Sequence, residues 1–260
     1  MTVSTALKAQ VKKILSDSQI RATKHIVYSL LYRNNLRNLA MAFRTDKEGP
    51  HFYARHYQHH FHQLRRSKIN LLEIGIGGYK DPKAGGNSLR MWKAYFANGN
   101  IFGIDIHDKA YHDEKRIKTF KGSQIDEEFL RNVVAEIGGI DIVIDDGSHY
   151  NDHVIKTFKI LFPLLSPIGI YVIEDLQTSY WDEVAGDKWG GSSDLKAAHT
   201  SMNFLKSLVD GLNYEEFTVD EYTPTYFDRN IISIHFYHNL SFIYKGDNNE
   251  GSNVLGERFP

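Results

Sequence analysis

The sequence predicts an α/β fold: a doubly wound, mostly parallel sheet of seven strands, preceded by a helical extension and closed by an antiparallel hairpin. Between residues 69 and 173, short apolar runs alternate with amphipathic stretches, the pattern of parallel strands that are buried on both faces. The β-like runs 231–237 and 240–244 are separated only by His238-Asn239, which indicates a hairpin. Apolar residues recur at helical spacing before residue 44.

The spacing of apolar residues predicts the individual elements. We expect strands at 69–74, 100–106, 118–120, 140–144 and 168–173, and helices at 88–97, 126–137 and 152–165. Ser88 and Asp126 precede two of these helices and are candidate N-caps. Helical patterns also cover 6–15, 26–41 and 52–64, whereas 44–51 is polar and is broken by Gly49-Pro50. We therefore expect an extension over 1–43, an α/β domain over 44–246 and a polar tail over 247–260.

The composition excludes several classes of protein and site. Of the 260 residues, 42% are hydrophobic, enough for one large core, and the net charge of -1 argues against a nucleic-acid partner. The absence of cysteine excludes disulfides, thiolate metal ligands and cysteine nucleophiles. No signal-peptide core and no apolar run of about 20 residues occurs, so we expect a cytoplasmic protein without a membrane partner.

Glycines follow the first predicted strand in the run Glu73-Ile74-Gly75-Ile76-Gly77-Gly78. They let a ligand approach the backbone, but Lys80 occupies the position where a dinucleotide fingerprint needs a third glycine. S-adenosylmethionine has no phosphate and carries two cationic groups that favour a carboxylate such as Glu73. The second strand ends at Asp105, which can accept hydrogen bonds from ribose hydroxyls. Ser123 and Gln124 follow the third strand, where polar side chains could bind adenine. The alternative is a structural glycine turn with a surface aspartate and a plain loop.

Carboxylates close the next two strands. Asp146 follows the fourth strand, and Glu174 and Asp175 follow the fifth, so all three should open into one crevice. Their mutual repulsion is relieved by a hard divalent cation, for which oxygen ligands favour Mg²⁺, with Mn²⁺ or Ca²⁺ as alternatives. His149 is a candidate general base, since histidine titrates near working pH. The alternatives are that Asp145 or Asp146 caps a helix, that His149 is an ordinary loop residue, and that Glu174-Asp175 is surface charge.

Two other clusters allow a structural or a functional interpretation. His56, His59 and His60, within the His-rich segment 55–62, have helical spacing and could form a second metal site, although exposed histidines are the plainer interpretation. Phe52, Tyr53 and Tyr57 could line the acceptor cavity or simply pack in the core.

These motifs resemble those of macrolide-sugar O-methyltransferases of the mycinamicin and macrocin type. The resemblance covers about residues 44–182 and rests on Thr45-Asp46-Lys47, the glycine run, Asp105, Ser123-Gln124, Asp146-Gly147-Ser148-His149 and Glu174-Asp175-Leu176. It implies a class I, Rossmann-like methyltransferase that depends on S-adenosylmethionine and Mg²⁺ and acts on a sugar hydroxyl in antibiotic or glycan biosynthesis. It further implies that Asp146, Glu174 and Asp175 bind the metal, that His149 is the base, and that Thr45 contributes to the cofactor pocket. The largest members of the family carry a long N-terminal auxiliary domain, whereas only residues 1–44 precede Thr45 here.

The sequence thus predicts an O-methyltransferase that acts on a small glycoside or polyol. We expect the metal to chelate the substrate diol and His149 to deprotonate it. The methyl group comes from a cofactor that Gly75, Gly77 and Asp146 are also expected to contact. We expect residues 181–193 to form a mobile lid and a closed homo-oligomer to be the default assembly. The alternatives are a catechol-type O-methyltransferase and a non-catalytic protein that binds a nucleotide, NAD or another cofactor.

Overall fold

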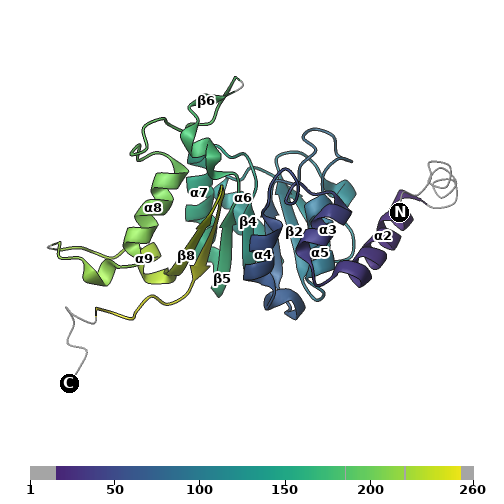
Figure 1. Cartoon of the computed structure of the whole chain (residues 1–260), viewed down its shortest axis with the longest axis horizontal. Coiled ribbons are helices and arrows are strands. Elements are labelled where there is room, and N and C mark those ends of the chain that lie inside the picture. Colours follow the sequence, from purple (N-terminus) through teal and green to yellow (C-terminus); the bar gives the residue numbers. More distant parts are fainter. Residues whose placement is uncertain (1–15, 185, 220, 253–260) are drawn as a thin grey trace. The chain divides into compact units, whose positions relative to one another are not determined.

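The computed structural model of the chain describes residues 16–252, except Ala185 and Asp220, and divides into two compact units. The first contains the described residues up to Lys68 together with Gly86–Gly99, and the second contains Ile69–Gly85 and the described residues from Asn100 on (Figure 1). The boundary expected at residue 44 falls inside the first unit. The helix expected at 6–15 and the last residues of the expected polar tail lie outside the described residues.

The first unit is helical. Its elements are α2 (Asp17–Tyr32), α3 (Leu36–Phe43), α4 (Ala54–Phe61), the 3-10 helix η1 (Leu64–Arg66) and α5 (Asn87–Tyr95). The single helix expected over 26–41 is wrong, because the Asn35 side chain accepts a hydrogen bond from the backbone N–H of Asn38 at 3.0 Å and so starts a new helix. The expected N-cap at Ser88 is also wrong: Gly86 is the N-cap of α5, and Ser88 lies inside the helix.

Aromatic packing forms the core of the first unit. Tyr57 is fully buried, and its ring centroid lies 4.9 Å from that of Trp92 and 5.2 Å from that of Phe61. Tyr53 is 4% exposed, whereas Phe52 is 56% exposed. Tyr53 and Tyr57 therefore belong to the core, which is the plainer of the two interpretations that the sequence allowed.

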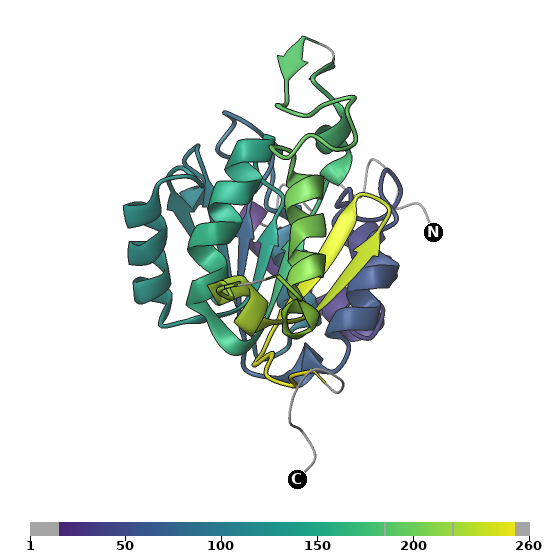
Figure 2. The same ribbon diagram turned by 90° about the vertical axis from the view of Figure 1, so that its left-hand side faces the viewer.

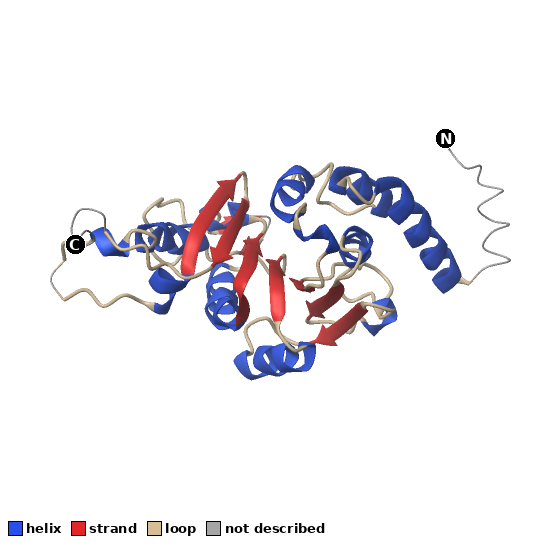
Figure 3. Cartoon of the chain, turned by 90° about the horizontal axis from the view of Figure 1, so that it is seen from below, coloured by secondary structure: helices blue, strands red, loops and turns tan. Residues whose placement is uncertain are grey.

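The second unit is built on a seven-stranded sheet with the order β3-β2-β1-β4-β5-β9-β8. The strands, drawn in red in Figure 3, are β1 (Asn70–Ile74), β2 (Asn100–Asp105), β3 (Ile117–Lys121), β4 (Ile140–Asp145), β5 (Leu165–Ile173), β8 (Ile231–Tyr237) and β9 (Leu240–Lys245). The first five pair in parallel, and β9 pairs antiparallel with both β5 and β8. The predicted doubly wound sheet with its C-terminal hairpin is confirmed.

Helices α6 (Glu127–Ile137), α7 (Asn151–Leu161) and α8 (Ser201–Gly211) stand side by side on one face of this sheet (Figure 2). Asp126 is the N-cap of α6, as predicted, and its side chain accepts a hydrogen bond from the N–H of Phe129. The short helix α9 (Tyr226–Asn230) and the 3-10 helices η2 (Ala110–His112), η3 (Phe162–Leu164), η4 (Leu176–Tyr180) and η5 (Tyr214–Glu216) occupy connections. Neither α8 nor α9 was predicted from the sequence.

The core of the second unit lies between the sheet and these helices. Leu72, Val143 and Tyr171, from three adjacent strands, are fully buried together with Phe158 of α7. Successive residues of β1 and β4, which point to opposite faces of the sheet, are also buried, and this is the reason that the strands read as continuous apolar runs. In the described part of the chain, no helix is both long and apolar enough to cross a membrane.

Candidate active site

The strand order places the candidate residues of the second unit at one end of its sheet. The order reverses between β1 and β4, and ligands of open α/β sheets bind outside the carboxyl ends of the strands at such a point. In the register, Ile74 lies beside both Ile104 and Asp145, and Asp145 lies beside Ile173. The loops that follow these four strands therefore start at the same level.

The glycine loop after β1 has no room for side chains where it meets β4. Gly75 has φ +88°, and a Cβ there would lie 2.0 Å from the carbonyl oxygen of Asp146. Its N–H donates to the carbonyl of Ile104 at 2.8 Å, and the N–H of Asp146 donates to the carbonyl of Ile74 at 3.0 Å. The glycine is required because the chains of β1, β2 and β4 come together at this residue.

Asp105 ties the end of β2 to the glycine loop. Its carboxylate accepts hydrogen bonds from the N–H of Ile76 at 3.1 Å and from the N–H of His107 at 2.8 Å. The side chain is half-buried, and each oxygen keeps a lone pair beyond the one it uses here. Asp105 thus fixes the loop and retains acceptor capacity of the kind that ribose hydroxyls need.

A buried lysine holds the long loop that follows the glycines. Lys109 is 1% exposed, and its ammonium donates to the carbonyl oxygens of Tyr79 and Asp81 at 2.8 Å and of Ala84 at 3.3 Å. The carbonyl of Ala84 also lies 3.1 Å from His112 Nε2. Lys109 was not predicted from the sequence, because nothing in its local pattern separates it from a surface lysine.

Two carboxylates and a histidine converge after β4 and β5. Ligand atoms of Asp146, His149 and Asp175 all lie within 4.8 Å of one another. His149 Nε2 is 3.9 Å from Asp146 Oδ1 and 3.7 Å from Asp175 Oδ2, and the three side chains are only 16–22% exposed. Carboxylate and imidazole donors of this kind can hold a divalent cation.

Backbone strain marks the same place. His149 has φ +57° and Asp175 has φ +55°, both in the left-handed region that residues with a Cβ seldom occupy. Such conformations persist only where the surrounding structure imposes them, and they cluster at functional sites. Glu174, the other predicted ligand, is 3% exposed, and its carboxylate does not join the group formed by its neighbour Asp175.

Asp145 is the last residue of β4 and directly precedes Asp146 in the chain. Burial, and secondarily the charge of Asp146, raises the pKa of Asp145 to about 7, although a hydrogen bond from the N–H of Gly147 at 3.4 Å opposes the shift. Burial also raises the pKa of Tyr171 well above its usual value, and the charge of Asp145 adds to this. Among the described residues, neither Asp145 Oδ2 nor the Tyr171 hydroxyl has a partner at normal hydrogen-bond geometry. Neither Asp145 nor Asp146 caps α7, whose N-cap is Tyr150.

The other predicted cofactor residues differ in their surroundings. Glu73 is fully buried on β1, and Ser123 is half-buried, its hydroxyl accepting from the N–H of Ile125 at 3.4 Å. The Gln124 side chain is hydrogen-bonded inside the protein, to Asp145, Thr157 and Ser148. Thr45 belongs to the first unit, where it is 7% exposed and its hydroxyl lies 3.8 Å from the sulfur of Met91.

The predicted lid segment, 181–193, contains a small hairpin of β6 (Glu183–Val184) and β7 (Asp187–Lys188) that projects from the second unit (Figure 2). Two hydrogen bonds hold the end of this hairpin. The carbonyl of Trp189 accepts from the backbone N–H of Asn151 at 3.1 Å and from the side-chain amide of Asn151 at 2.9 Å. The Trp189 ring packs against Tyr150, next to His149, with the centroids 5.5 Å apart. Trp189, in the second half of the segment, thus lies beside the turn that carries His149.

Asn151 connects several parts of this region, although it was not predicted from the sequence. It is 1% exposed; its amide also donates to the carbonyl of Thr178, and its oxygen accepts from the backbone N–H of Ser201 at 2.7 Å. It therefore joins the start of α7 to η4, to the predicted lid and to α8. No local signal could have shown this, since Ser201 lies 50 residues away.

The structure gathers no second metal group from the His-rich segment. Among the described residues, Asp146, His149 and Asp175 form the one group of histidine and acidic side chains close enough to hold an ion. In α4, His59 and His60 contact each other edge to face, with centroids 5.0 Å apart.

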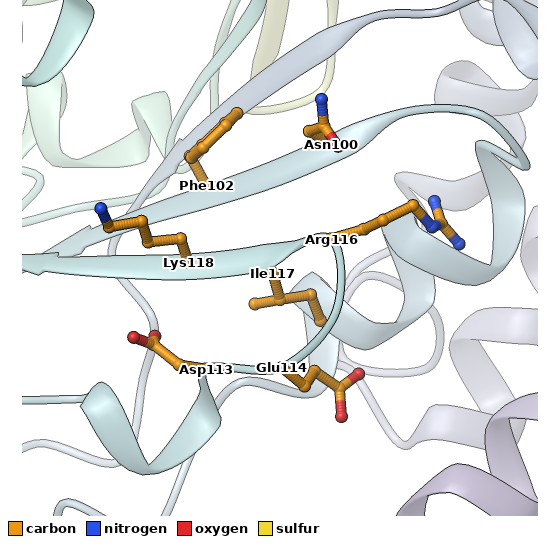
Figure 4. Close-up of a pocket in the computed structure, with 7 residues that line it drawn as sticks. All are labelled: Asn100, Phe102, Asp113, Glu114, Arg116, Ile117 and Lys118. Atoms are coloured by element: carbon orange, nitrogen blue, oxygen red, sulfur yellow. The ribbon is translucent and has the colours of Figure 1, made fainter. Parts of the chain in front are cut away.

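A hollow of about 480 Å³ elsewhere in the second unit is lined by Asn100, Phe102, Asp113, Glu114, Arg116, Ile117 and Lys118 (Figure 4). Asn100 and Ile117 begin β2 and β3, so the hollow lies at the amino ends of the strands, away from the residues described above. The Asp113 carboxylate accepts from the N–H and hydroxyl of Thr119, and Lys118 pairs with Glu136. We assign no ligand to it.

Comparison with known proteins identifies relatives of the chain, although no family model matches it. It is 48% identical over 219 residues to the demethylmacrocin O-methyltransferase of Streptomyces fradiae, covering 84% of this chain and 54% of the relative. It is 46% identical over 220 residues to the mycinamicin VI 2''-O-methyltransferase of Micromonospora griseorubida, with the same coverage of 84% and 54%. Over most of its length the chain is therefore similar to these O-methyltransferases.

A solved structure agrees with the sequence comparison. The MycE methyltransferase of the mycinamycin biosynthetic pathway, in complex with Mg, S-adenosylhomocysteine and mycinamycin VI, matches with a TM-score of 0.79 and 44% identity over 86% of this chain and 57% of that chain. The resemblance and the class I methyltransferase fold predicted from the sequence are thereby confirmed. The chain spans about half the length of the curated relatives that it matches.

Proposed function

We propose that the chain is an S-adenosylmethionine-dependent and divalent-metal-dependent O-methyltransferase that acts on a hydroxyl group of a sugar or glycosylated small molecule. The observation that carries the proposal is the convergence of Asp146, His149 and Asp175 after β4 and β5, beside the glycine loop of β1. The relatives support the choice of acceptor, since one is named for a rhamnosyl tetracenomycin-C, two are named for demethylmacrocin and mycinamicin VI, and MycE was solved with mycinamycin VI.

The donor set fits the proposed metal. Asp146 and Asp175 offer carboxylate oxygens within 4.8 Å of each other, and the buried Glu174 is the proposed third carboxylate. Oxygen ligands without thiolates favour Mg²⁺, with Mn²⁺ or Ca²⁺ as alternatives. For the cofactor we propose Gly75 and Gly77 at the glycine loop, Asp105 at the ribose, Ser123 near the adenine, and Thr45, Glu73 and Asp146 as further contacts.

In this proposal His149 accepts the proton of the acceptor hydroxyl through Nε2, which lies within 4 Å of a carboxylate oxygen of both Asp146 and Asp175, the proposed metal ligands. The hydroxyl oxygen bonds to the methyl carbon as the carbon–sulfur bond breaks, and S-adenosylhomocysteine leaves. When bound, the cation lowers the pKa of the hydroxyl and S-adenosylmethionine supplies the methyl group. The residues 181–193, anchored through Asn151 and Trp189, would cover the acceptor.

A methyl-transfer assay read by mass spectrometry tests the proposal, with S-adenosylmethionine, Mg²⁺ and a panel of macrolide glycosides, simple sugars, polyols and catechols. We expect methylated glycosides, loss of turnover with chelator and recovery with added Mg²⁺. Turnover that resists chelator removes the metal role, and methylation of catechols alone replaces the sugar acceptor with an aromatic one. A chain that binds S-adenosylhomocysteine but methylates nothing would indicate a non-catalytic protein.

Single variants separate the roles in the same assay. His149→Ala should lower kcat by about 10²-fold or more, the usual effect of losing a general base. His235→Ala on the edge strand β8, exposed and separated from β4 by β9 and β5, is the matched control and should retain the rate. Full activity of His149→Ala excludes this histidine as the base.

A further inference from the structure

Gln124 is almost completely buried, and all of its amide hydrogens are in use. The side chain is 8% exposed, and Nε2 lies 3.3 Å from Asp145 Oδ1 and 3.1 Å from Thr157 Oγ1. Oε1 accepts the backbone N–H of Ser148 at 2.8 Å. A carboxamide has two N–H donors, so none is left for a nitrogen of adenine.

The chemistry of its partners fixes the orientation of the amide. The backbone nitrogen of Ser148 can only donate, so the group 2.8 Å from it must be the Gln124 oxygen. A reversed amide would set two N–H groups against each other and leave Asp145 Oδ1 without this donor. The arrangement is therefore the only one that satisfies both contacts.

The oxygen of Gln124 also fits against a bare backbone. A Cβ on Gly147 would lie 2.3 Å from Gln124 Oε1 and 3.0 Å from its Cδ. Gly147 is thus the place where the turn after β4 closes over the amide. Asp146 and His149, the proposed metal ligand and base, lie on the two sides of the Gly147-Ser148 pair that Gln124 supports.

The amide is held in turn by α7. Thr157 is fully buried, accepts from Gln124 Nε2, and has its hydroxyl 3.0 Å from the carbonyl of Gln124 and 2.7 Å from that of His153. On the other side of the loop, the N–H of Gly122 donates to the carbonyl of Asp105 at 2.9 Å. Gln124 therefore connects the loop after β3 to the turn after β4, with α7 as a rigid support.

We propose that Gln124 is a positioning residue that holds the turn carrying Asp146 and His149, and that its side chain does not read the adenine of the cofactor. The inference rests on the proposed function, which assigns Asp146 to the metal and His149 to the proton transfer. It separates the roles of two neighbours that the sequence grouped together: Ser123 remains available to a ligand, whereas Gln124 acts through the turn.

The test compares cofactor affinity with turnover in Gln124→Met, which keeps the length of the side chain and removes its polar atoms. The affinity for S-adenosylhomocysteine is measured by calorimetry in the presence of chelator, and kcat is measured at saturating S-adenosylmethionine and Mg²⁺. We expect the Kd to change less than about threefold and kcat to fall roughly 10- to 100-fold, because a displacement of about 1 Å at reacting groups has effects of this size. Added Mg²⁺ should raise the melting temperature of the protein, and the Mg²⁺ concentration that gives half of this rise should be higher for the variant than for the wild type.

The opposite pattern, a changed Kd with an unchanged kcat, overturns the inference. If Gln124→Met raises the Kd of S-adenosylhomocysteine tenfold or more and leaves kcat unchanged, the side chain reads the cofactor. If the variant changes neither quantity, Gln124 positions nothing. Glu128→Gln, at an exposed position on the adjoining helix α6, is the matched control and should alter neither.

A second variant keeps the test decisive if Gln124→Met does not fold. Thr157→Val removes the hydroxyl that accepts from Gln124 Nε2 and should lower kcat in the same direction, by less, without changing the Kd; an unchanged kcat contradicts the inference. Where both variants fold, the double variant should lose no more than Gln124→Met alone, since Thr157 acts through Gln124. A wild-type chain that binds no S-adenosylhomocysteine overturns the proposed function instead, so the two failures are distinguishable.

Discussion

The buried carboxyl group of Asp145 makes the stability of the metal-free protein depend on pH. Its pKa is raised from 3.8 to about 7, chiefly by burial. Between these values the folded protein keeps the proton that the unfolded chain has lost, so the contribution of Asp145 to the free energy of unfolding falls as pH rises through this window. Each pKa unit corresponds to about 1.36 kcal/mol, so above pH 7 the charged carboxylate destabilises the fold by at most about 4 kcal/mol.

Asp145→Asn removes the charge and keeps the shape. The amide oxygen can still accept from Gly147 and Gln124, and the amide nitrogen then faces the Tyr171 hydroxyl. We therefore expect the variant to match the wild type near pH 4 and to become more stable by up to about 4 kcal/mol at pH 8. The gain should develop between pH 4 and 7 and then stay constant.

Urea unfolding at pH values from 4 to 8, with chelator present throughout, measures the difference. Asp152→Asn is the control: this aspartate is exposed in the first turn of α7, and its loss should lower stability by about 0.5 kcal/mol or less. A stability difference for Asp145→Asn that does not change with pH, or a variant less stable than the wild type at pH 8, would refute the reasoning.

Three further predictions concern the supports of the site. Gly75→Ala places a Cβ 2.0 Å from the Asp146 carbonyl oxygen, so it should lower both the affinity for S-adenosylhomocysteine and the melting temperature. An alanine variant for which calorimetry gives the affinity and the melting temperature of the wild type contradicts the close approach. Lys109→Met removes a buried ammonium from three carbonyl oxygens and should lower the free energy of unfolding by roughly 2–4 kcal/mol, measured in urea, whereas the exposed Lys80→Met should change it little. Asp126→Ala removes the cap of α6 and should lower stability by about 1 kcal/mol in the same measurement, and no loss would show that the cap is dispensable.

The pattern of the sequence was sufficient for the sheet. Strand and helix positions follow from the period of apolar residues, which records how each face is buried, and so all seven strands of the main sheet lie where expected. The helical patterns were less reliable at their ends. The break between α2 and α3 depends on one Asn35 hydrogen bond, and the start of α5 at Gly86 depends on a left-handed backbone conformation that Ser88 did not reveal.

The candidate site, too, was predicted from the sequence only in part. The sequence alone placed Asp105, Asp146 and Asp175 at strand ends, and parallel pairing then puts those ends at one side of the sheet. The sequence alone also showed the resemblance to a known family, because the residues of each motif are adjacent in the chain.

Only the tertiary structure decided what each buried polar group does. Gln124 meets Asp145 across 21 residues and Thr157 across 33, and Asn151 meets Ser201 across 50. The pKa of Asp145 and the cage around Lys109 likewise depend on groups that only folding brings together. The periodicity of a chain records which side of an element is buried, whereas a hydrogen bond or a pKa depends on atoms brought within a few ångströms by distant segments.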